Sequence, residues 1–379
     1  MSEGQTKLPM VDDHQVDSCC AEEESALDYG SAAEADWVNG QIETAVGPVY
    51  RINTTLERGD LLGSFKARWG VGRMSYIVPP GLYAVGNPDQ SSPVLVSANY
   101  KLSFDSLRRE LSGLNLWILV INTKGINVWC AAGKGTFGTE EVIRMVNATR
   151  LHELVLKKTL IMPQLSAPGV TAFEVRRRCG FKVIFGPVRA ADIPAFLKTG
   201  NRTDTAMRRT YFGLLDRLVL TLVELTALVK PLAYFTLFLF LLNLVSVLLV
   251  GDSFQPAFLI GQTFFDLVPF LGAVLVGAVF VPAMLPYLPG RALSWKGLVL
   301  GLIWAVIYKG LLGSEAGLLE TASYFLIIPA VAAFLSINFT GSTTYTSLSG
   351  VVKEMKFALP PIIVAAGLGL IALIASYFV

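Results

Sequence analysis

The residues best suited to chemistry lie in the stretch Asn127–Lys134, which places one cysteine, Cys130, among tryptophan, alanine and glycine. A strand-like run, Leu116–Asn122, precedes this stretch, and a helix-like run, Thr139–Val146, follows it. A thiol between a strand and a helix can face a ligand, and a helix N-terminus favours its thiolate. The alternative is that Cys130 is a small buried apolar residue, as cysteines often are.

The other potential metal ligands are few. The chain has four cysteines, of which Cys19 and Cys20 lie in the polar N-terminal tail and Cys179 follows a helix-like run. No C-x2-C pair occurs, so the sequence predicts neither a zinc ribbon nor a cysteine-held iron–sulfur cluster. His152 is the only histidine outside the tail and is expected at a surface or a helix end. A transition metal bound here would therefore suit a macrocyclic cofactor that supplies its own ring nitrogens.

A glycine-rich string, Gly133–Gly138, matches G-x-G-x-x-G. In a dinucleotide site the first glycine directly follows the strand, whereas here roughly ten residues intervene, so the turn is misplaced. A P-loop that contained Gly133 and Lys134 would need a glycine at position 128 and a serine or threonine at position 135. The sequence has valine and glycine there, so a P-loop is excluded. The glycines alone do not predict a nucleotide site.

Alternating strand-like and helix-like runs predict the elements that would position Cys130. The expected strands are 49–56, 94–98, 116–122, 155–162 and 181–185, and the expected helices are 104–111, 139–147 (capped by Thr139), 172–179 and 192–198. A loop at 66–72, with two glycines, is expected to approach a ligand. Apolar strands alternating with helices predict a Rossmann-like α/β domain with a mostly parallel sheet covered on both faces. Ligands of such sheets bind at the carboxyl ends of the strands, where Cys130 is expected.

Most of the apolar residues lie after residue 210. Five stretches are near the roughly 20 apolar residues that cross a bilayer, and we predict all-α transmembrane spans at 231–250, 261–283, 297–313, 318–337 and 359–379. Residues 206–230 are expected to form an amphipathic interfacial helix or linker. The predicted domains are thus a disordered acidic tail (1–45), an α/β domain (46–205), this linker and a five-span domain (231–379).

Basic residues are concentrated in the loops before the first span, between spans two and three, and between spans four and five. Short basic loops stay cytoplasmic, so we predict a multi-pass protein of the inner (cytoplasmic) membrane, with the α/β domain cytoplasmic and the C-terminus outside. The tail carries no signal-peptide pattern. The net charge of +2 gives no reason to predict a nucleic-acid partner.

The segment Asn338–Gly350 is dense in hydroxyl groups. It is either a solvated connector or a donor-rich surface for a polar ligand such as a corrin side chain.

The string Asn127–Lys134 resembles the cap-helix motif N-V/I-W-C-A-A/G-G-K of the corrinoid protein family of mercury methylation. That family is related to the large subunits of the corrinoid iron–sulfur proteins of the acetyl-CoA pathway. The likeness includes the stretches GLYAVGNP, PVLVSANYKLSF and FGPVRAADIPAFLK and the segment NFTGSTTYTSLSGVVKEM. It covers residues 60 to 379, and the tail has no counterpart.

The resemblance implies a cobalamin-type corrinoid with Cys130 as the lower axial ligand of cobalt. The cap-helix residues would shape the lower face of the corrinoid: Asn127, Val128, Trp129, Ala131, Ala132, Gly133 and Lys134. Small residues there would let the sulfur approach cobalt. Neighbouring strand ends would line the rest of the pocket, through Asn99, Thr123, Gly125, Gly186 and Pro187.

The implied function is methyl transfer to inorganic Hg(II), giving methylmercury, from methyl-Co(III) with a thiolate opposite the methyl group. The implied partners are a small ferredoxin-like protein with two 4Fe–4S clusters as electron donor, a methyl-donor methyltransferase and membrane lipid. One alternative is a membrane-bound corrinoid methyl carrier of one-carbon (acetyl-CoA pathway) metabolism. A second is a transporter or structural protein with a cytoplasmic regulatory domain, although Asp266 is the only ionisable residue expected near a span's start, which argues against transport.

Overall fold

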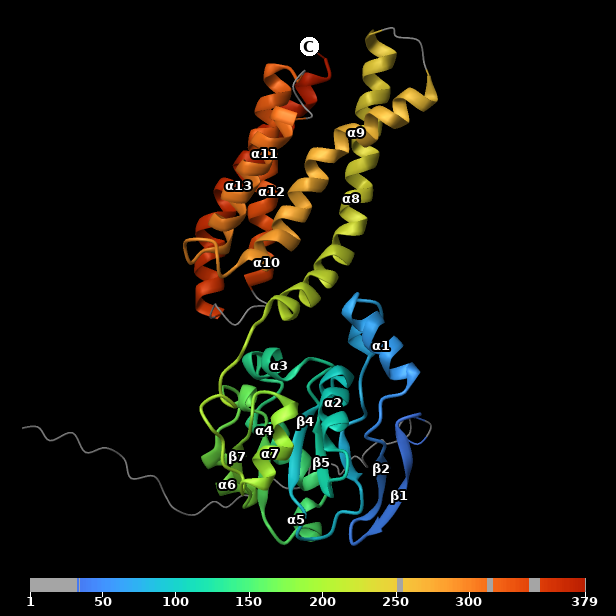
Figure 1. Ribbon diagram of the computed structural model, residues 1–379, viewed down its shortest axis with the longest axis vertical. Coiled ribbons are helices and arrows are strands. Elements are labelled where there is room, and N and C mark those ends of the chain that lie inside the picture. The colour runs from blue at the N-terminus through green and yellow to red at the C-terminus, as the bar shows by residue number, and fades with distance from the viewer. Residues whose placement is uncertain (1–32, 34, 251–254, 312–315, 341–347, 379) are drawn as a thin grey trace, which may run out of the picture. The chain divides into compact units, whose positions relative to one another are not determined.

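The computed structural model describes residues 33, 35–250, 255–311, 316–340 and 348–378. The chain divides into two compact units (Figure 1). The first contains residues up to Glu57 together with Tyr76–Arg208, and the second contains Arg58–Ser75 together with Arg209–Val379. Cys19, Cys20 and most of the predicted tail lie outside the described residues.

The first unit is built on a seven-stranded mixed sheet in the order β1-β2-β3-β5-β4-β6-β7. Its strands are β1 (Val38–Thr44), β2 (Gly47–Ile52), β3 (Gly81–Val85), β4 (Val94–Ala98), β5 (Leu116–Ile121), β6 (Thr159–Met162) and β7 (Lys182–Phe185). The four strands β5, β4, β6 and β7 are parallel, whereas β3 pairs antiparallel to β5 and β1 antiparallel to β2. The prediction of a mixed α/β domain is confirmed, and its Rossmann-like character stays a prediction.

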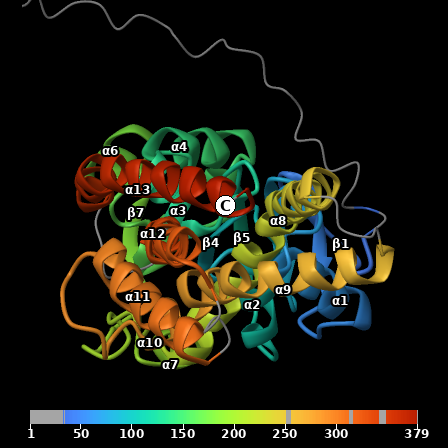
Figure 2. The same ribbon diagram turned by 90° about the horizontal axis from the view of Figure 1, so that it is seen from above.

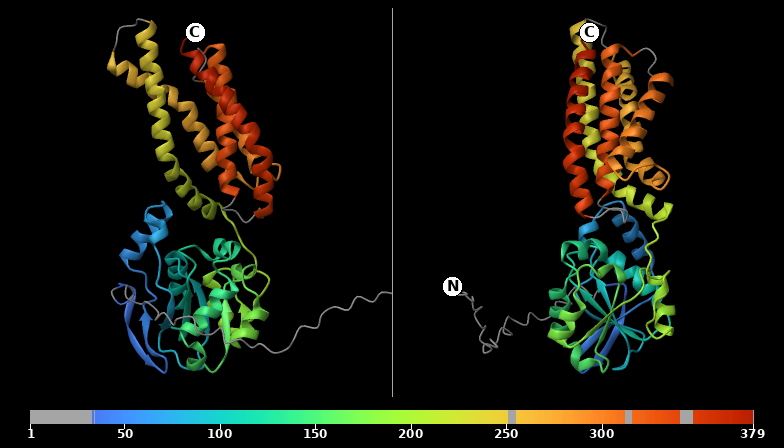
Figure 3. Two further views of the ribbon diagram at one scale, coloured as in Figure 1. Left: turned by 180° about the vertical axis from the view of Figure 1, so that it is seen from behind. Right: turned by 90° about the vertical axis from the view of Figure 1, so that its left-hand side faces the viewer.

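Helices cover both faces of this sheet (Figure 3). One face packs against α3 (Val128–Lys134), α4 (Thr139–Ala148), α5 (Leu151–Leu154) and α6 (Ala172–Cys179). The other packs against α2 (Lys101–Arg108) and α7 (Ile193–Lys198). Along β5, Trp117, Leu119 and Ile121 face the first set, and Leu116, Ile118 and Val120 face the second. This alternation with period two buries every β5 side chain, as expected for a strand inside a two-faced sheet.

Several predicted elements need correction. Strand β1 lies inside the range predicted to be a disordered tail, and β3, which directly follows Pro79 and Pro80, was not among the predicted strands. The predicted ligand loop at 66–72 overlaps the end of α1 (Arg58–Arg68), which belongs to the second unit. Thr139 is not a cap: Gly138 holds that position, and the Thr139 hydroxyl instead accepts a hydrogen bond from the Thr171 amide at 2.9 Å.

The second unit consists of helices. After α1 come α8 (Leu214–Val250), α9 (Pro256–Leu275), a π-helical turn at Val276–Phe280, α10 (Val281–Met284), α11 (Leu293–Leu311), α12 (Leu318–Thr340) and α13 (Leu348–Ser376). Figure 2 shows α11, α12 and α13 as neighbours. Within the described residues, four helical stretches are long and apolar enough to cross a membrane: Leu214–Leu249, Pro256–Met284, Leu318–Phe339 and Gly350–Ser376.

The third predicted span and the predicted interfacial segment differ from the structure. The third predicted span corresponds to α11, which carries Lys296 and Lys309 and is not among the four. The predicted interfacial segment is no separate element, because α8 runs without interruption through Pro231. Arg217 in its first part is buried and donates hydrogen bonds to the carbonyl oxygens of Pro282 and Ala283, at 3.1 and 2.6 Å. These carbonyl oxygens satisfy the buried guanidinium, so an apolar helix can accommodate Arg217.

A carboxylate, Asp266, joins three helices of this unit. Its oxygens accept hydrogen bonds from the Asn243 amide of α8 at 2.8 Å, from the Gln262 amide of α9 at 2.9 Å, and from the Tyr377 hydroxyl after α13 at 2.7 Å. Three donors replace the water that a carboxylate would otherwise require. Asp266 therefore has a packing role in this bundle.

Candidate functional site

Cys130 lies in the first turn of the short helix α3, and Asn127 determines where that helix begins. Asn127 has extended backbone angles, and its side-chain oxygen accepts a hydrogen bond from the Cys130 amide at 2.9 Å. This is the N-cap arrangement, which satisfies one of the amides that a helix start leaves unpaired. At the other end Gly135 adopts a left-handed conformation with φ of 79°. The helix has only seven residues, and both of its ends are closed by local geometry.

The loop between β5 and α3 is held by one buried side chain, Asn99, at the carboxyl end of β4. The Asn99 side-chain oxygen accepts hydrogen bonds from the Thr123 amide (3.0 Å), the Thr123 hydroxyl (2.9 Å) and the Gly125 amide (3.0 Å). Gly125 has a φ of 70°, which a side chain would disfavour. The structure therefore brings together the predicted residues Asn99, Thr123 and Gly125, and their hydrogen bonds fix the loop that leads to Cys130.

The residues of α3 divide between the core and the surface. Ala131 and Ala132 are buried in the core, Val128, Trp129 and Cys130 are half-buried, and Gly133 and Lys134 are exposed.

The backbone of α3 lies close to Gly169. A side-chain carbon at Gly169 would come within 3.0 Å of the Ala132 Cα atom, so the two backbones run close together there. This contact explains the glycine at position 169, and the predicted reason for the small residues of α3, which was to let the sulfur approach a ligand, stays a prediction.

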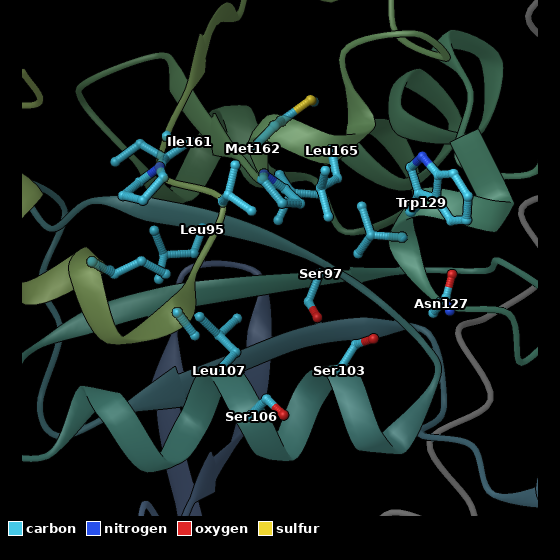
Figure 4. Close-up of a pocket in the computed structure, with 18 of the residues that line it drawn as sticks. Leu95, Ser97, Ser103, Ser106, Leu107, Asn127, Trp129, Ile161, Met162 and Leu165 are labelled. Atoms are coloured by element: carbon cyan, nitrogen blue, oxygen red, sulfur yellow. The ribbon is translucent and has the colours of Figure 1, made fainter. Parts of the chain in front are cut away.

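A cavity of about 380 Å³ opens beside α3, at the carboxyl ends of β4, β6 and β7. Five of the predicted residues line it: Asn127, Val128, Trp129, Gly186 and Pro187. Figure 4 shows Asn127 and Trp129 at one end of the cavity and apolar side chains of β4 and β6, such as Leu95 and Ile161, toward the other. Cys130 follows Trp129 directly but does not itself line the cavity.

Three serine hydroxyls in this cavity were not predicted. Ser103 and Ser106 come from α2, and Ser97 comes from β4 (Figure 4). The spacing of Ser103 and Ser106, three residues apart, puts both on one face of α2 and is the sequence signal that could have identified them.

Helix α2 is held in place by a buried group of charges. The Asp105 carboxylate accepts hydrogen bonds from Lys101 Nζ at 2.8 and 2.9 Å and from Arg108 Nε at 2.8 Å. Arg108 is fully buried and also donates to the carbonyl oxygens of Asn53 (2.6 Å) and Thr55 (3.1 Å). These contacts tie α2 to the segment after β2 and so fix the serine-bearing wall of the cavity.

The two cysteines in the described part of the chain differ in setting. The Cys179 thiol donates a hydrogen bond to the Val175 carbonyl oxygen at 3.1 Å, and burial raises the pKa of this thiol. Cys179 is therefore expected to remain protonated and unreactive. Cys130 instead stands at the carboxyl edge of the sheet beside the cavity.

The described residues contain no group of three or more histidine, cysteine or acidic side chains that could hold a metal ion. The side chain of His152 is about half exposed, and its Nε2 atom lies 3.6 Å from Oε1 of Glu153, which is consistent with a surface residue.

The string Gly133–Gly138 connects two helices. Gly135 ends α3 and Gly138 begins α4, so neither glycine forms a turn between a strand and a helix. Its geometry therefore differs from that of a dinucleotide site.

The residues present fit a corrinoid in two respects. Within the described residues, Cys130 is the one thiol beside the cavity, and a single thiolate ligand suits a metal whose other ligands come from a macrocycle. The cavity is mostly apolar with a few hydroxyls, and the side-chain oxygen of Gln164, between the lining residues Pro163 and Leu165, is buried without a hydrogen-bond partner in the described structure. A buried acceptor of this kind is compatible with a polar group of a bound molecule.

Comparison with known proteins shows that the first unit is similar to subunits of acetyl-CoA decarbonylase/synthase complexes. A sequence profile of the family described as the CO dehydrogenase/acetyl-CoA synthase delta subunit matches residues 72–197, which include β3 to β7 and every predicted site residue. Over 123 residues the chain is 32% identical to the acetyl-CoA decarbonylase/synthase complex subunit gamma of Methanopyrus kandleri and 31% identical to that of Archaeoglobus fulgidus. The subunit gamma of Methanocaldococcus jannaschii is 28% identical over 128 residues.

These matches cover 32–33% of this chain, and the chain spans about a quarter (26%) of the length of these relatives. They support the broader part of the sequence resemblance, to the large subunits of the corrinoid iron–sulfur proteins. The narrower resemblance, to the corrinoid proteins of mercury methylation, rests on the string Asn127–Lys134.

Proposed function

We propose that this chain is a membrane-attached, corrinoid-dependent methyltransferase in which Cys130 is the lower axial ligand of cobalt and Hg(II) is the methyl acceptor. The observation that carries the proposal is the position of Cys130: a half-buried thiol in the first turn of an Asn-capped helix, at the carboxyl edge of the sheet and beside a cavity. The comparisons support the corrinoid and methyl-carrying part of the proposal. The mercury part rests on the cap-helix string.

When bound, the corrinoid would supply a cobalt centre that accepts and releases a methyl group. The chain would contribute the rest. Cys130 would hold the metal through its sulfur, and a sulfur ligand would tune the electronic properties of such a metal. Trp129 and Val128 provide apolar surface that excludes water from the side of the thiol, and the hydroxyls of Ser97, Ser103 and Ser106 offer hydrogen bonds inside the cavity. Asn127 and Asn99 hold the backbone that positions Cys130.

The first test is the visible absorption spectrum of the anaerobically purified chain after reconstitution with cobalamin. We expect cobalt bound in a stoichiometric amount, with a spectrum altered by a sulfur ligand. Cys130→Ala should retain the fold but lose that spectral signature, whereas Cys179→Ala should match the unsubstituted protein, because Cys179 is bonded within α6. A cobalt-free protein would refute the corrinoid proposal, and identical spectra for Cys130→Ala and the unsubstituted chain would refute the sulfur ligand.

The second test concerns the acceptor. The comparisons favour a second candidate function, a membrane-bound methyl carrier of one-carbon metabolism, because the matched relatives belong to acetyl-CoA decarbonylase/synthase complexes. The chain loaded with a methyl group should be given Hg(II) and, separately, an acetyl-CoA-forming complex. Methylmercury formation that falls by at least about a hundredfold, a typical loss for a catalytic group, in Cys130→Ala supports the first function. Transfer only to the acetyl-CoA-forming complex supports the second.

The proposal also includes partners and location. Because the described residues hold no cluster-forming cysteine group, electrons would come from a ferredoxin-like protein with two 4Fe–4S clusters, and methyl groups from a methyl-donor methyltransferase. Four long apolar helices are consistent with a multi-pass inner-membrane protein. The cytoplasmic position of the α/β unit and the outer position of the C-terminus follow from the basic loops and belong to the proposal.

A further inference from the structure

The second unit contains a cavity that the proposed methyl transfer does not use. It has a volume of about 920 Å³ and lies where α11 and α13 begin, near the end of α10. Three cations, Arg291, Lys296 and Lys353, and one carboxylate, Glu354, line it. The lining therefore carries an excess of positive charge at one end of the apolar helices.

The four charged side chains have different roles. Glu354 accepts a hydrogen bond from the Ser294 amide at 2.6 Å, at the start of α11, and Lys296 is buried and donates to the Leu285 carbonyl oxygen at 2.8 Å. The side chains of Glu354 and Lys296 are therefore already hydrogen-bonded within the protein. Arg291 and Lys353 are exposed, and neither side chain has a hydrogen bond or ion pair with any described residue. They remain available to an anion.

An apolar groove continues from this cavity. It has a volume of about 390 Å³, and Ser294 and Ala358 line both spaces. The groove lies between α11, α12 and α13, and its walls are almost entirely apolar, with residues such as Leu298, Phe325 and Ile362. A cationic cavity at the helix ends thus adjoins an apolar groove along the helices.

We propose that this combined space binds an anionic phospholipid. The phosphate would interact with Arg291 and Lys353, and one acyl chain would occupy the groove. Basic pockets between membrane helices attract anionic headgroups, and Lys and Arg at helix ends keep their charged groups at the membrane interface. Inorganic phosphate shares the headgroup chemistry, but it would leave the apolar groove unused.

The test uses the delipidated full chain in detergent, with phosphatidylglycerol, phosphatidylcholine and inorganic phosphate as probes and native mass spectrometry as the readout. We expect phosphatidylglycerol to bind more tightly than phosphatidylcholine, and phosphate alone not to compete. Arg291→Gln and Lys353→Gln should each weaken phosphatidylglycerol binding by about fivefold. Lys356→Gln is the matched control: it removes the same charge from the same exposed end of α13, but Lys356 does not line the cavity.

A separate substitution tests the groove. Ala365 lines the groove but not the cationic cavity, so Ala365→Phe would fill part of the groove and leave Arg291 and Lys353 unchanged. We expect this variant to bind long-chain lipid more weakly. Circular dichroism would verify that each variant keeps its helix content. Equal binding of both lipids, competition by phosphate alone, or an equal loss in Lys356→Gln would each overturn the proposal. None of these outcomes depends on cobalt or methyl transfer.

Discussion

Two asparagines near the candidate site hold the backbone in place through hydrogen bonds. Both were predicted as residues of the corrinoid pocket. Asn99 lines no part of the cavity, and its oxygen accepts three hydrogen bonds from the loop before α3. Asn127 does line the cavity, but it also caps the helix. Their role in a corrinoid pocket stays a prediction, whereas the structure shows that both side chains hold the backbone in place.

The cap leads to a prediction for Asn127→Ala. Loss of an N-cap oxygen costs about 1 kcal/mol of helix stability. We therefore expect the α3 amides, Cys130 included, to exchange with solvent about fivefold faster in hydrogen-exchange measurements, because 1.4 kcal/mol corresponds to roughly tenfold. Asn127→Ser keeps a capping oxygen and should stay near the original rate. Unchanged exchange in Asn127→Ala would mean that the cap does not stabilise α3.

Among the elements, α11 and α12 pack most closely, and glycines permit it. A side-chain carbon at Gly297 would lie 2.5 Å from the Ala332 carbonyl oxygen and 2.7 Å from the Ala333 Cα atom. Gly301 is similarly placed, 2.7 Å from the Pro329 Cα atom. Small residues at such positions let membrane helices approach each other, and dispersion contacts between the backbones then stabilise the pair.

We therefore expect substitutions at two glycines of α11 to have different effects on thermal stability. Gly297→Ala should lower the thermal stability of the detergent-solubilised protein, because overpacking costs about 1–3 kcal/mol. Gly310→Ala should have no such effect and could stabilise α11 by up to about 1 kcal/mol, because an added carbon there meets no atom of the described residues within 4 Å. Equal melting temperatures for the two variants would contradict the close packing of α11 on α12.

Two strands that are buried on both faces, and one helix that has an exposed face, were predicted with nearly their observed bounds. The apolar run Val94–Ala98 and the helix Ala172–Cys179 have the predicted bounds, and Leu116–Ile121 differs by one residue. Strand β1 could not be recognised in this way, because its residues are exposed or half-buried at the edge of the sheet and do not alternate regularly. Turn residues before β3 likewise concealed a strand that is completely buried. Local sequence predicts what is buried, and edge pairing depends on partners far along the chain.

At the scale of the whole molecule, the sequence becomes mainly apolar near residue 210, which is close to the boundary between the two compact units at Arg208 and Arg209. The cavity that Arg291 and Lys353 line could not be predicted, because it forms between the starts of two helices that are about 60 residues apart in the sequence. The hydroxyl-rich segment predicted as a ligand surface lies mostly outside the described residues. Its first residues, up to Thr340, continue α12.

The assignment of α1 to the second unit bears on how the protein can be divided. The chain passes between the two units three times, near residues 57, 75 and 208, so no single cut separates them. A soluble fragment ending at Arg208 would retain α1 but lose α8, and the exposed Leu61, Leu62 and Phe65 would remain on its surface. Exposed apolar patches of this kind favour aggregation. A tractable fragment for spectroscopy would therefore need residues 58–75 replaced by a short polar linker between β2 and β3.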